Sequence, residues 1–190
     1  MTTKEIANAW PGTLAKIDFI APKPLLPSAT ISFLHAAGLP RTFTMHGSQV
    51  MTFTTLATAQ PLSAMWNERI RDWLMPVDWA RYWRIGDIAY TQASAWLCVE
   101  EVTGRVCAID IDIDDSVYPV NESLTTLASS MLHWVRWYES SGGAVGSLDA
   151  LRQAFAQDVT FKPNEYASFW GMLIYAEAES GIERLTVAHS

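Results

Sequence analysis

Four aspartates stand close together in the segment IDIDIDDS, namely Asp110, Asp112, Asp114 and Asp115. Clustered carboxylate oxygens are ligands that calcium prefers. An EF-hand loop that began at the first of them would need glycine at its sixth position and glutamate at its twelfth, where the chain has Asp115 and Asn121. The alternating pattern instead favours a strand whose isoleucines point inward and whose aspartates form a solvated face. We interpret this face as a surface for a basic partner, with a metal-dependent function as the alternative.

Other residue types that could do chemistry do not gather in the sequence. The four histidines are scattered, without the spacing of a zinc site or of a general base held by a carboxylate. Cys98 and Cys107 have no basic neighbours that would activate a thiol, and two cysteines do not form a disulfide framework. The chain has no P-loop, no GxSxG elbow and no GxGxxG loop. We therefore expect a binding protein that is not an enzyme and that needs no cofactor or metal.

The composition is that of a globular protein with a sizeable core. Of 190 residues, 49% are hydrophobic and 17% are charged. The net charge of −7 opposes binding to nucleic acid and suits a basic protein partner. The N-terminal segment lacks the apolar stretch of a secretory signal, and no apolar run is long enough to span a bilayer. These features predict a cytoplasmic protein without a membrane partner.

Hydrophobic periodicity and breaker residues predict helices first, then clustered strands, then helices again, an order typical of an α+β fold. Thr2 and Glu5 have the spacing of a capping box. Ser28 can cap a short helix that ends at Gly38, where a positive φ is expected. The other patterns predict a strand over 49–56, a helix over 63–75, a strand over 82–90 interrupted at Gly86, a hairpin over 95–113, and helices from 121 or 123 to 138, over 148–157 and over 164–179.

The register of the hairpin can be predicted if its sheet has one buried face. A three-residue loop, 102–104, places Val99 opposite Cys107 and puts the apolar residues of both strands on one side. It also gives Gly104 the left-handed position that such a loop needs. In this register Cys98 and Cys107 point to opposite faces, so we expect no disulfide between them.

The helix that follows the hairpin carries an apolar stripe of Leu124, Leu127, Met131, Trp134 and Tyr138. Trp137 lies off this stripe, and we expect it to be partly exposed. An exposed tryptophan is a candidate anchor for a protein partner, because tryptophan is enriched in interface hot spots. Cover by the C-terminal helices is the alternative.

Four short motifs in order, GLPR at 38–41, IGD at 85–87, TGRV at 103–106 and YPVNESL at 118–124, resemble the SUKH superfamily, and the best match is its fourth group of bacterial immunity proteins. The resemblance covers about residues 30–140. It implies a single α+β domain over 1–190 with a central, mostly antiparallel sheet flanked by helices. The core of this domain would be 30–140, with a helical C-terminal extension over 147–180. The matching residues, Gly38, Leu39, Pro40, Gly86, Gly104 and Asn121, have structural explanations and define no binding site.

The resemblance also implies a function. Members of this group are typically encoded beside polymorphic toxins, and they bind and occlude a toxin domain, often a nuclease or a nucleic-acid deaminase, without a cofactor. We therefore expect this chain to bind a cognate toxin protein that is basic. A regulatory or scaffold module of the same fold, with no toxin partner, is the alternative.

Overall fold

The computed structural model describes residues 2–16, 26–45, 50–53, 60–64, 77–89, 94–110, 116–141, 148–158 and 169–188. Its helices are α1 (Thr3–Ala9), α2 (Ser28–Ala36), α4 (Leu124–Ser141), α5 (Leu148–Asp158), α6 (Phe169–Ala188) and the short 3₁₀ helix η1 (Val77–Arg81). Its strands are β1 (Leu14–Ala15), β2 (Leu39–Pro40), β3 (Thr42–Thr44), β4 (Val50–Phe53), β5 (Gln60–Pro61), β6 (Tyr82–Ala89), β7 (Ser94–Glu100), β8 (Val106–Asp110) and β9 (Ser116–Asn121).

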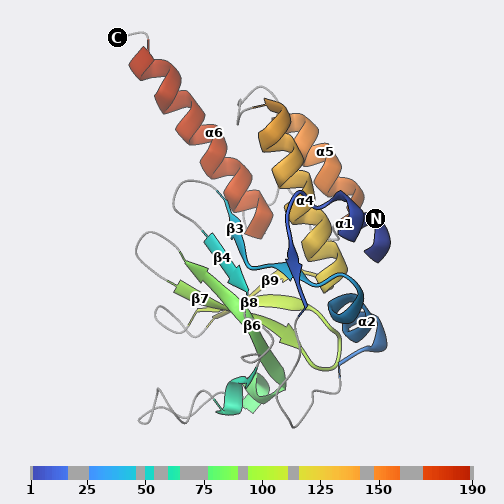
Figure 1. The fold of residues 1–190 in the computed structure, drawn as a ribbon. Helices are drawn as coiled ribbons and strands as arrows, with labels where there is room; N and C mark the ends of the chain where they lie inside the picture. The colour runs from blue at the N-terminus through green and yellow to red at the C-terminus, as the bar shows by residue number, and fades with distance from the viewer. Residues whose placement is uncertain are drawn as a thin grey trace.

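The main sheet has the strand order β3-β4-β6-β7-β8-β9, with β5 paired to β6, and each of these pairs is antiparallel. The strands β1 and β2 form a separate antiparallel pair. The α-helices gather on one side of the sheet, whereas η1 lies at the other end of the molecule (Figure 1). The predicted α+β fold, a mostly antiparallel sheet flanked by helices, is confirmed.

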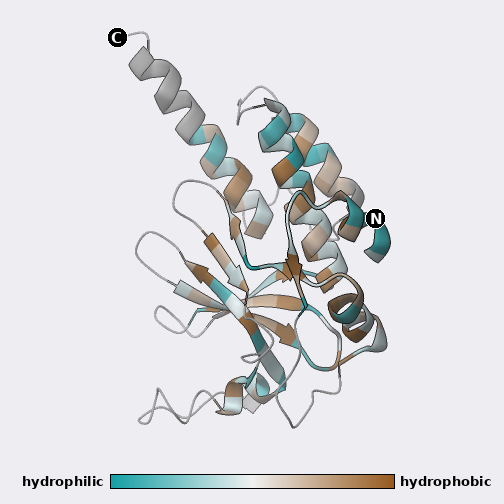
Figure 2. Cartoon of the chain, viewed as in Figure 1, coloured by the Kyte–Doolittle hydropathy of each residue, from teal (hydrophilic) through white to brown (hydrophobic). Residues whose placement is uncertain are grey.

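The main sheet is buried on both faces. The helix face, which includes Trp83, Leu97 and Val99, belongs to the large core formed with α1, α2, α4, α5 and α6. The opposite face, which we call the second face, buries a smaller cluster of Leu62, Trp79, Tyr82, Trp96, Cys98, Cys107 and Ile109. Hydrophobic residues accordingly recur along the strands and along the helices (Figure 2).

The predicted hairpin register is wrong by one residue. Val99 lies opposite Val106, and Cys98 lies opposite Cys107. The connection is a four-residue turn, 101–104, because Glu100 already donates its N–H to the carbonyl of Arg105 at 2.8 Å. The prediction assumed one buried face and so grouped all apolar residues on one side. With two buried faces, Cys98 and Cys107 share the second face, and both are free thiols.

Two glycines stand where neighbouring backbone comes too close for a side chain. Gly38 has a φ of 82°, and a Cβ there would lie 2.2 Å from the carbonyl oxygen of Ala15. A Cβ on Gly86 would lie 2.3 Å from the carbonyl oxygen of Thr52, and the β6–β7 register shifts between Arg84 and Gly86. The predicted helix stop at Gly38 and the predicted irregularity at Gly86 are both confirmed.

Capping explains where several helices begin. Thr2 and Glu5 form the predicted capping box of α1. Ser123 caps α4, because its hydroxyl accepts from the N–H of Thr126 at 3.1 Å while its own N–H donates to the Thr126 hydroxyl at 3.0 Å. Ser28 was expected to cap α2, but the N-cap is Pro27.

Other predicted boundaries have mixed outcomes. The strand β9 and the short strand β3 were not predicted, and α6 begins later and ends later than expected. Most of the helix predicted over 63–75 lies outside the described residues.

Candidate partner-binding surface

Asp110 is the last residue of β8 and lies opposite Ser116 of β9. Its exposed fraction is 8%, so the prediction of a solvated side chain is wrong. Strand alternation places Asp110 on the same face as Ala108, which belongs to the helix-side core, whereas Ile109 belongs to the second face. Because both faces are covered, alternation along β8 does not separate core from solvent. The other three aspartates, Asp112, Asp114 and Asp115, lie outside the described residues.

Trp137 is buried, with an exposed fraction of 5%, and its predicted exposure is wrong. Its ring packs edge-on against Trp134 at 5.5 Å between centroids. The helix α4 contacts α5 as well as α1, α2 and β9, so it buries more than the one stripe predicted. Tyr138, which was expected in the core, is 56% exposed instead.

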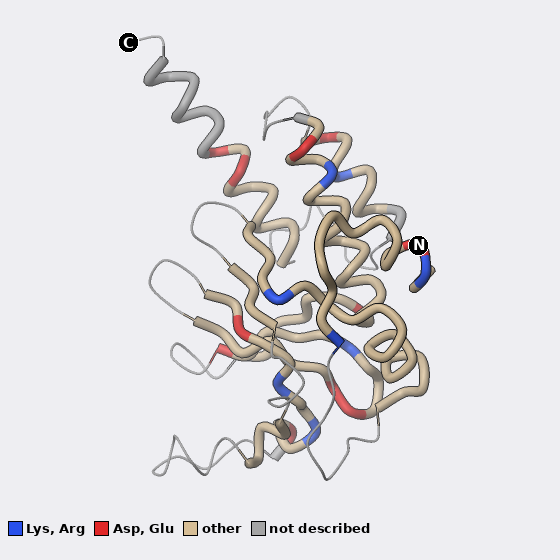
Figure 3. Tube along the Cα trace, in the orientation of Figure 1, with Lys and Arg blue, Asp and Glu red and all other residues tan. Residues whose placement is uncertain are grey.

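The end of the sheet that carries η1 and the β7–β8 turn has a network of polar contacts. Arg81, at the end of η1, forms an ion pair with the largely buried Glu100 at 3.1 Å between Nε and Oε1. The other carboxylate oxygen of Glu100 accepts from the hydroxyl of Thr103 in the turn. On the adjacent side, Arg105 donates to Glu122 at 2.9 Å, which joins the turn to the loop before α4. Acidic and basic segments accordingly lie close together at this end (Figure 3).

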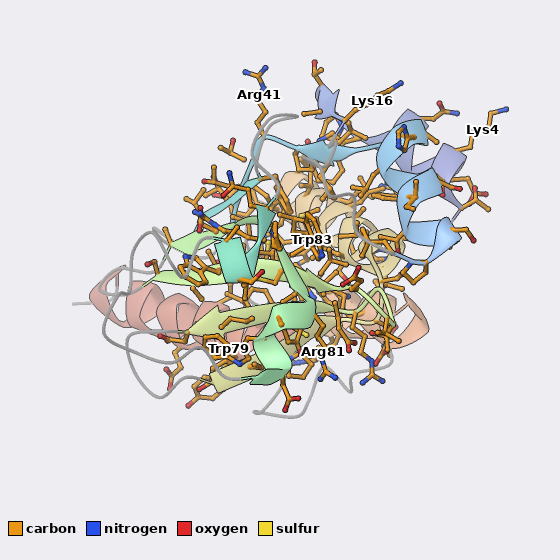
Figure 4. The ribbon with its side chains drawn as sticks, turned by 90° about the horizontal axis from the view of Figure 1, so that it is seen from below. Lys4, Lys16, Arg41, Trp79, Arg81 and Trp83 are labelled. Atoms are coloured by element: carbon orange, nitrogen blue, oxygen red, sulfur yellow. The ribbon has the colours of Figure 1, made fainter. Side chains whose placement is uncertain are left out.

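Two arginines also lie over aromatic rings that belong to the second-face cluster. The guanidinium of Arg81 lies 5.6 Å from the ring centre of Tyr82, and that of Arg84 lies 5.9 Å from the ring centre of Trp96. Both distances are within the range of cation–π attraction. Figure 4 shows Trp79 and Arg81 beside η1. Arg81 and Arg84 therefore place positive charge at the edge of the second-face cluster.

This network was not predicted from the sequence. The signal available was the segment EEVTGR at 100–105, in which carboxylates precede a glycine turn and an arginine follows it. Across the strands, Glu100 lies opposite Arg105, and the N–H of Glu100 donates to the carbonyl of Arg105. Arg81 and Glu122 come from distant parts of the chain, and their proximity follows from the sheet order, which the spacing of residues does not give.

The thiols of the second face are poorly suited to chemistry. Burial raises the pKa of Cys107 to about 11 and raises the pKa of Cys98 well above its ordinary value. The thiolate is the reactive form of cysteine, so both groups are weak nucleophiles at neutral pH. Over the described part of the chain, no three side chains of the metal-binding types come together at a possible metal site. The helices within those same segments are too short or too polar to cross a membrane.

Comparison with known proteins identifies a family. The family model described as "SUKH-4 immunity protein" matches residues 15–160, which is more than half of the chain. Neither the curated proteins nor the solved structures give a match. The matched range begins at β1 and ends just after α5, so it contains the whole main sheet and the η1 end. The chain belongs to the SUKH-4 immunity protein family.

Proposed function

We propose that this protein binds a toxin domain and neutralises it by covering part of the toxin surface, with no catalytic step of its own. The observation that carries the proposal is the match to the immunity family over residues 15–160. The fold supports the proposal, because a sheet buried on both faces leaves loops, turns and the outer sides of helices as the surface available to a partner. Immunity by occlusion requires a rigid, complementary surface and no reactive group.

We further propose that the toxin domain is basic and acts on nucleic acid, as a nuclease or a deaminase would. Enzymes of this kind carry positive charge, because most of their affinity comes from contacts with phosphate. A net charge of −7 on the present chain complements such a surface and accelerates the encounter. The aspartates that follow β8, Asp112, Asp114 and Asp115, remain a proposed contact for the basic toxin. The producing cell's cytoplasm is the proposed place of this encounter.

Co-expression tests the proposal directly. The toxin domain encoded beside this gene should arrest growth when it is expressed alone, and growth should recover when the present protein is expressed with it. A truncated chain that ends before α4 serves as a control, because it loses much of the helix-side core and should give no protection. If the full chain gives no protection and shows no binding to the purified toxin domain by calorimetry, the proposed function is wrong.

Salt dependence tests the proposed charge complementarity. The association rate should fall about tenfold or more between about 50 mM and about 300 mM NaCl, because salt screens long-range steering. The dissociation rate should change much less. An association rate that is independent of salt would contradict a basic partner while leaving the immunity function intact.

A further inference from the structure

Val102, at the tip of the β7–β8 turn, has 74% of its surface exposed, the largest fraction among the large hydrophobic residues on the described surface. Single exposed apolar residues are common on protein surfaces and do not by themselves mark a site. Val102 differs because of how firmly its turn is held. A turn whose backbone is already held in place loses little conformational entropy when a partner covers it, so a residue at its tip is well suited to anchor an interface.

Four hydrogen bonds hold the turn in place. The N–H of Gly104 donates to the carbonyl of Glu100 at 2.9 Å, which closes the turn. The Thr103 hydroxyl donates to the Glu100 carboxylate and accepts from the N–H of Arg105 at 3.2 Å. The N–H of Glu101 donates to the carbonyl of Arg81 at 2.8 Å, which ties the turn to the end of η1. The backbone on both sides of Val102 is therefore held in place.

The turn also rests on the start of α2. Gly104 is buried with a φ of +74°, and a Cβ there would lie 2.6 Å from the Thr30 hydroxyl and 3.3 Å from the ring of Pro27. The turn therefore cannot sink toward the core, and Val102 has to project. Ile31, next in the chain to Thr30, is a second exposed hydrophobic residue on α2. Val102 is thus an exposed apolar side chain on a turn that packs against the start of α2.

The charges that surround this projection favour one kind of partner. Four carboxylates lie on the segments that meet here, from Asp78, Glu100, Glu101 and Glu122, against the two arginines Arg81 and Arg105. Both arginines are already engaged in ion pairs with Glu100 and Glu122. Among the described residues of these segments the excess charge is therefore negative, which complements a basic surface and disfavours an acidic one.

We propose that the β7–β8 turn, with Val102 as its apolar anchor, is the surface with which this protein contacts a basic toxin domain that offers a shallow apolar depression. This inference rests on the proposed function and adds to it the contact surface. It adds to the contact proposed above a second one at the η1 end of the sheet, at the opposite end of β8 from Asp110.

The test compares three variants by calorimetry against the purified, catalytically inactivated toxin domain encoded beside this gene. Val102→Asp should weaken binding by about thirtyfold or more, and Val102→Ala by about fivefold, in the range of interface hot spots. The matched control is Tyr138→Asp, which adds the same charge at another exposed hydrophobic residue. Tyr138 lies 14 residues beyond the start of α4, about 20 Å along the helix, and its variant should bind within about twofold of the wild type.

Each result separates this inference from the proposed function. If the wild-type chain does not bind the toxin domain, the proposed function fails and this inference fails with it. If the wild type binds and Val102→Asp, shown to be folded by its thermal unfolding, binds equally well, this inference alone is overturned. If Val102→Asp instead abolishes self-association seen by sedimentation while toxin affinity is unchanged, the turn is an interface between copies of the chain, which also overturns it.

Discussion

The two faces of the main sheet bury cores of very different size. The helix face joins residues from five helices, and Trp170 is its largest fully buried side chain. The second face buries a smaller cluster that includes Leu62 and the Trp79 side chain of η1, and two arginines lie over its aromatic rings. Both faces exclude solvent, but the large one supplies most of the buried apolar area. The difference suggests that the helix face stabilises the fold while the second face positions the polar network at the η1 end.

Replacement of a tryptophan on each face should show this difference most strongly. Trp170 stacks on Phe155 at 5.1 Å between ring centres and donates from Nε1 to Asn121 at 2.9 Å. Its change to Ala should lower the free energy of unfolding by about 4–5 kcal/mol, and Trp79→Ala on the second face by about 3 kcal/mol. Urea unfolding measures both. A larger loss for Trp79→Ala would show that the small cluster, rather than the helices, holds the sheet together.

Replacement of Gly104 should disturb the turn between β7 and β8. The register of these two strands, and with it the assignment of their residues to the two faces, depends on this turn. Gly104→Val should cost about 2 kcal/mol, because a β-branched residue is strained at positive φ and would also meet Thr30. The control is Gly12→Ala, since Gly12 is exposed and a Cβ there would make only ordinary contact with the Trp10 side chain, at 3.9 Å, and it should change stability by less than about 0.5 kcal/mol. Wild-type thermal unfolding of Gly104→Val would contradict the described turn.

A conservative pair of isoleucine variants sharpens the comparison further. Ile88 lies on the helix face and Ile109 on the second face, and both are fully buried. Each change to Val removes one methylene group and should cost about 0.5–1.5 kcal/mol, because both sites are dry. Chemical denaturation of the two variants side by side is the measurement. No loss for Ile109→Val would mean that the second face is loosely packed.

A pH-dependent loss of stability should also distinguish the second face. Burial raises the pKa of Cys107 to about 11 and also raises the pKa of Cys98. Unfolded thiols ionise near pH ~8.5, so above that value the unfolded chain binds fewer protons than the folded chain. The free energy of unfolding should therefore fall as pH rises from about 9 to about 11. The double variant Cys98→Ala, Cys107→Ala should show a shallower fall, and equal slopes would contradict the buried positions of the thiols.

Local features of the fold could be predicted from sequence because each depends on neighbours in the chain. The capping box at Thr2 and Glu5, the helix stop at Gly38 and the left-handed Gly104 are all of this kind. The family resemblance also proved correct, because it used the order of several such motifs.

The sequence did not predict the β7–β8 register or the burial of Asp110, and it left the burial of Trp137 as an alternative. Each of these features depends on which distant part of the chain covers a surface. A strand that alternates isoleucine and aspartate is typical of a sheet with one wet face. Here Leu62 and the Trp79 side chain of η1 pack on the second face, and α5 packs against α4. The candidate contact surface was missed for the same reason, since Arg81 and Glu122 reach the turn only through the order of the strands.

Pro119 gives the outer strand β9 a property of its own. Among the strands of the described residues, β9 pairs with β8 alone, and Pro119 lies opposite Cys107. Because Glu100 and Arg105 bond to each other across β7 and β8, the backbone polar groups of Cys107 also point toward β7. The nitrogen of Pro119 therefore points out of the sheet, where it has no hydrogen to offer. An incoming strand from another molecule would find one backbone donor missing at Pro119, which disfavours edge-to-edge association of the sheet.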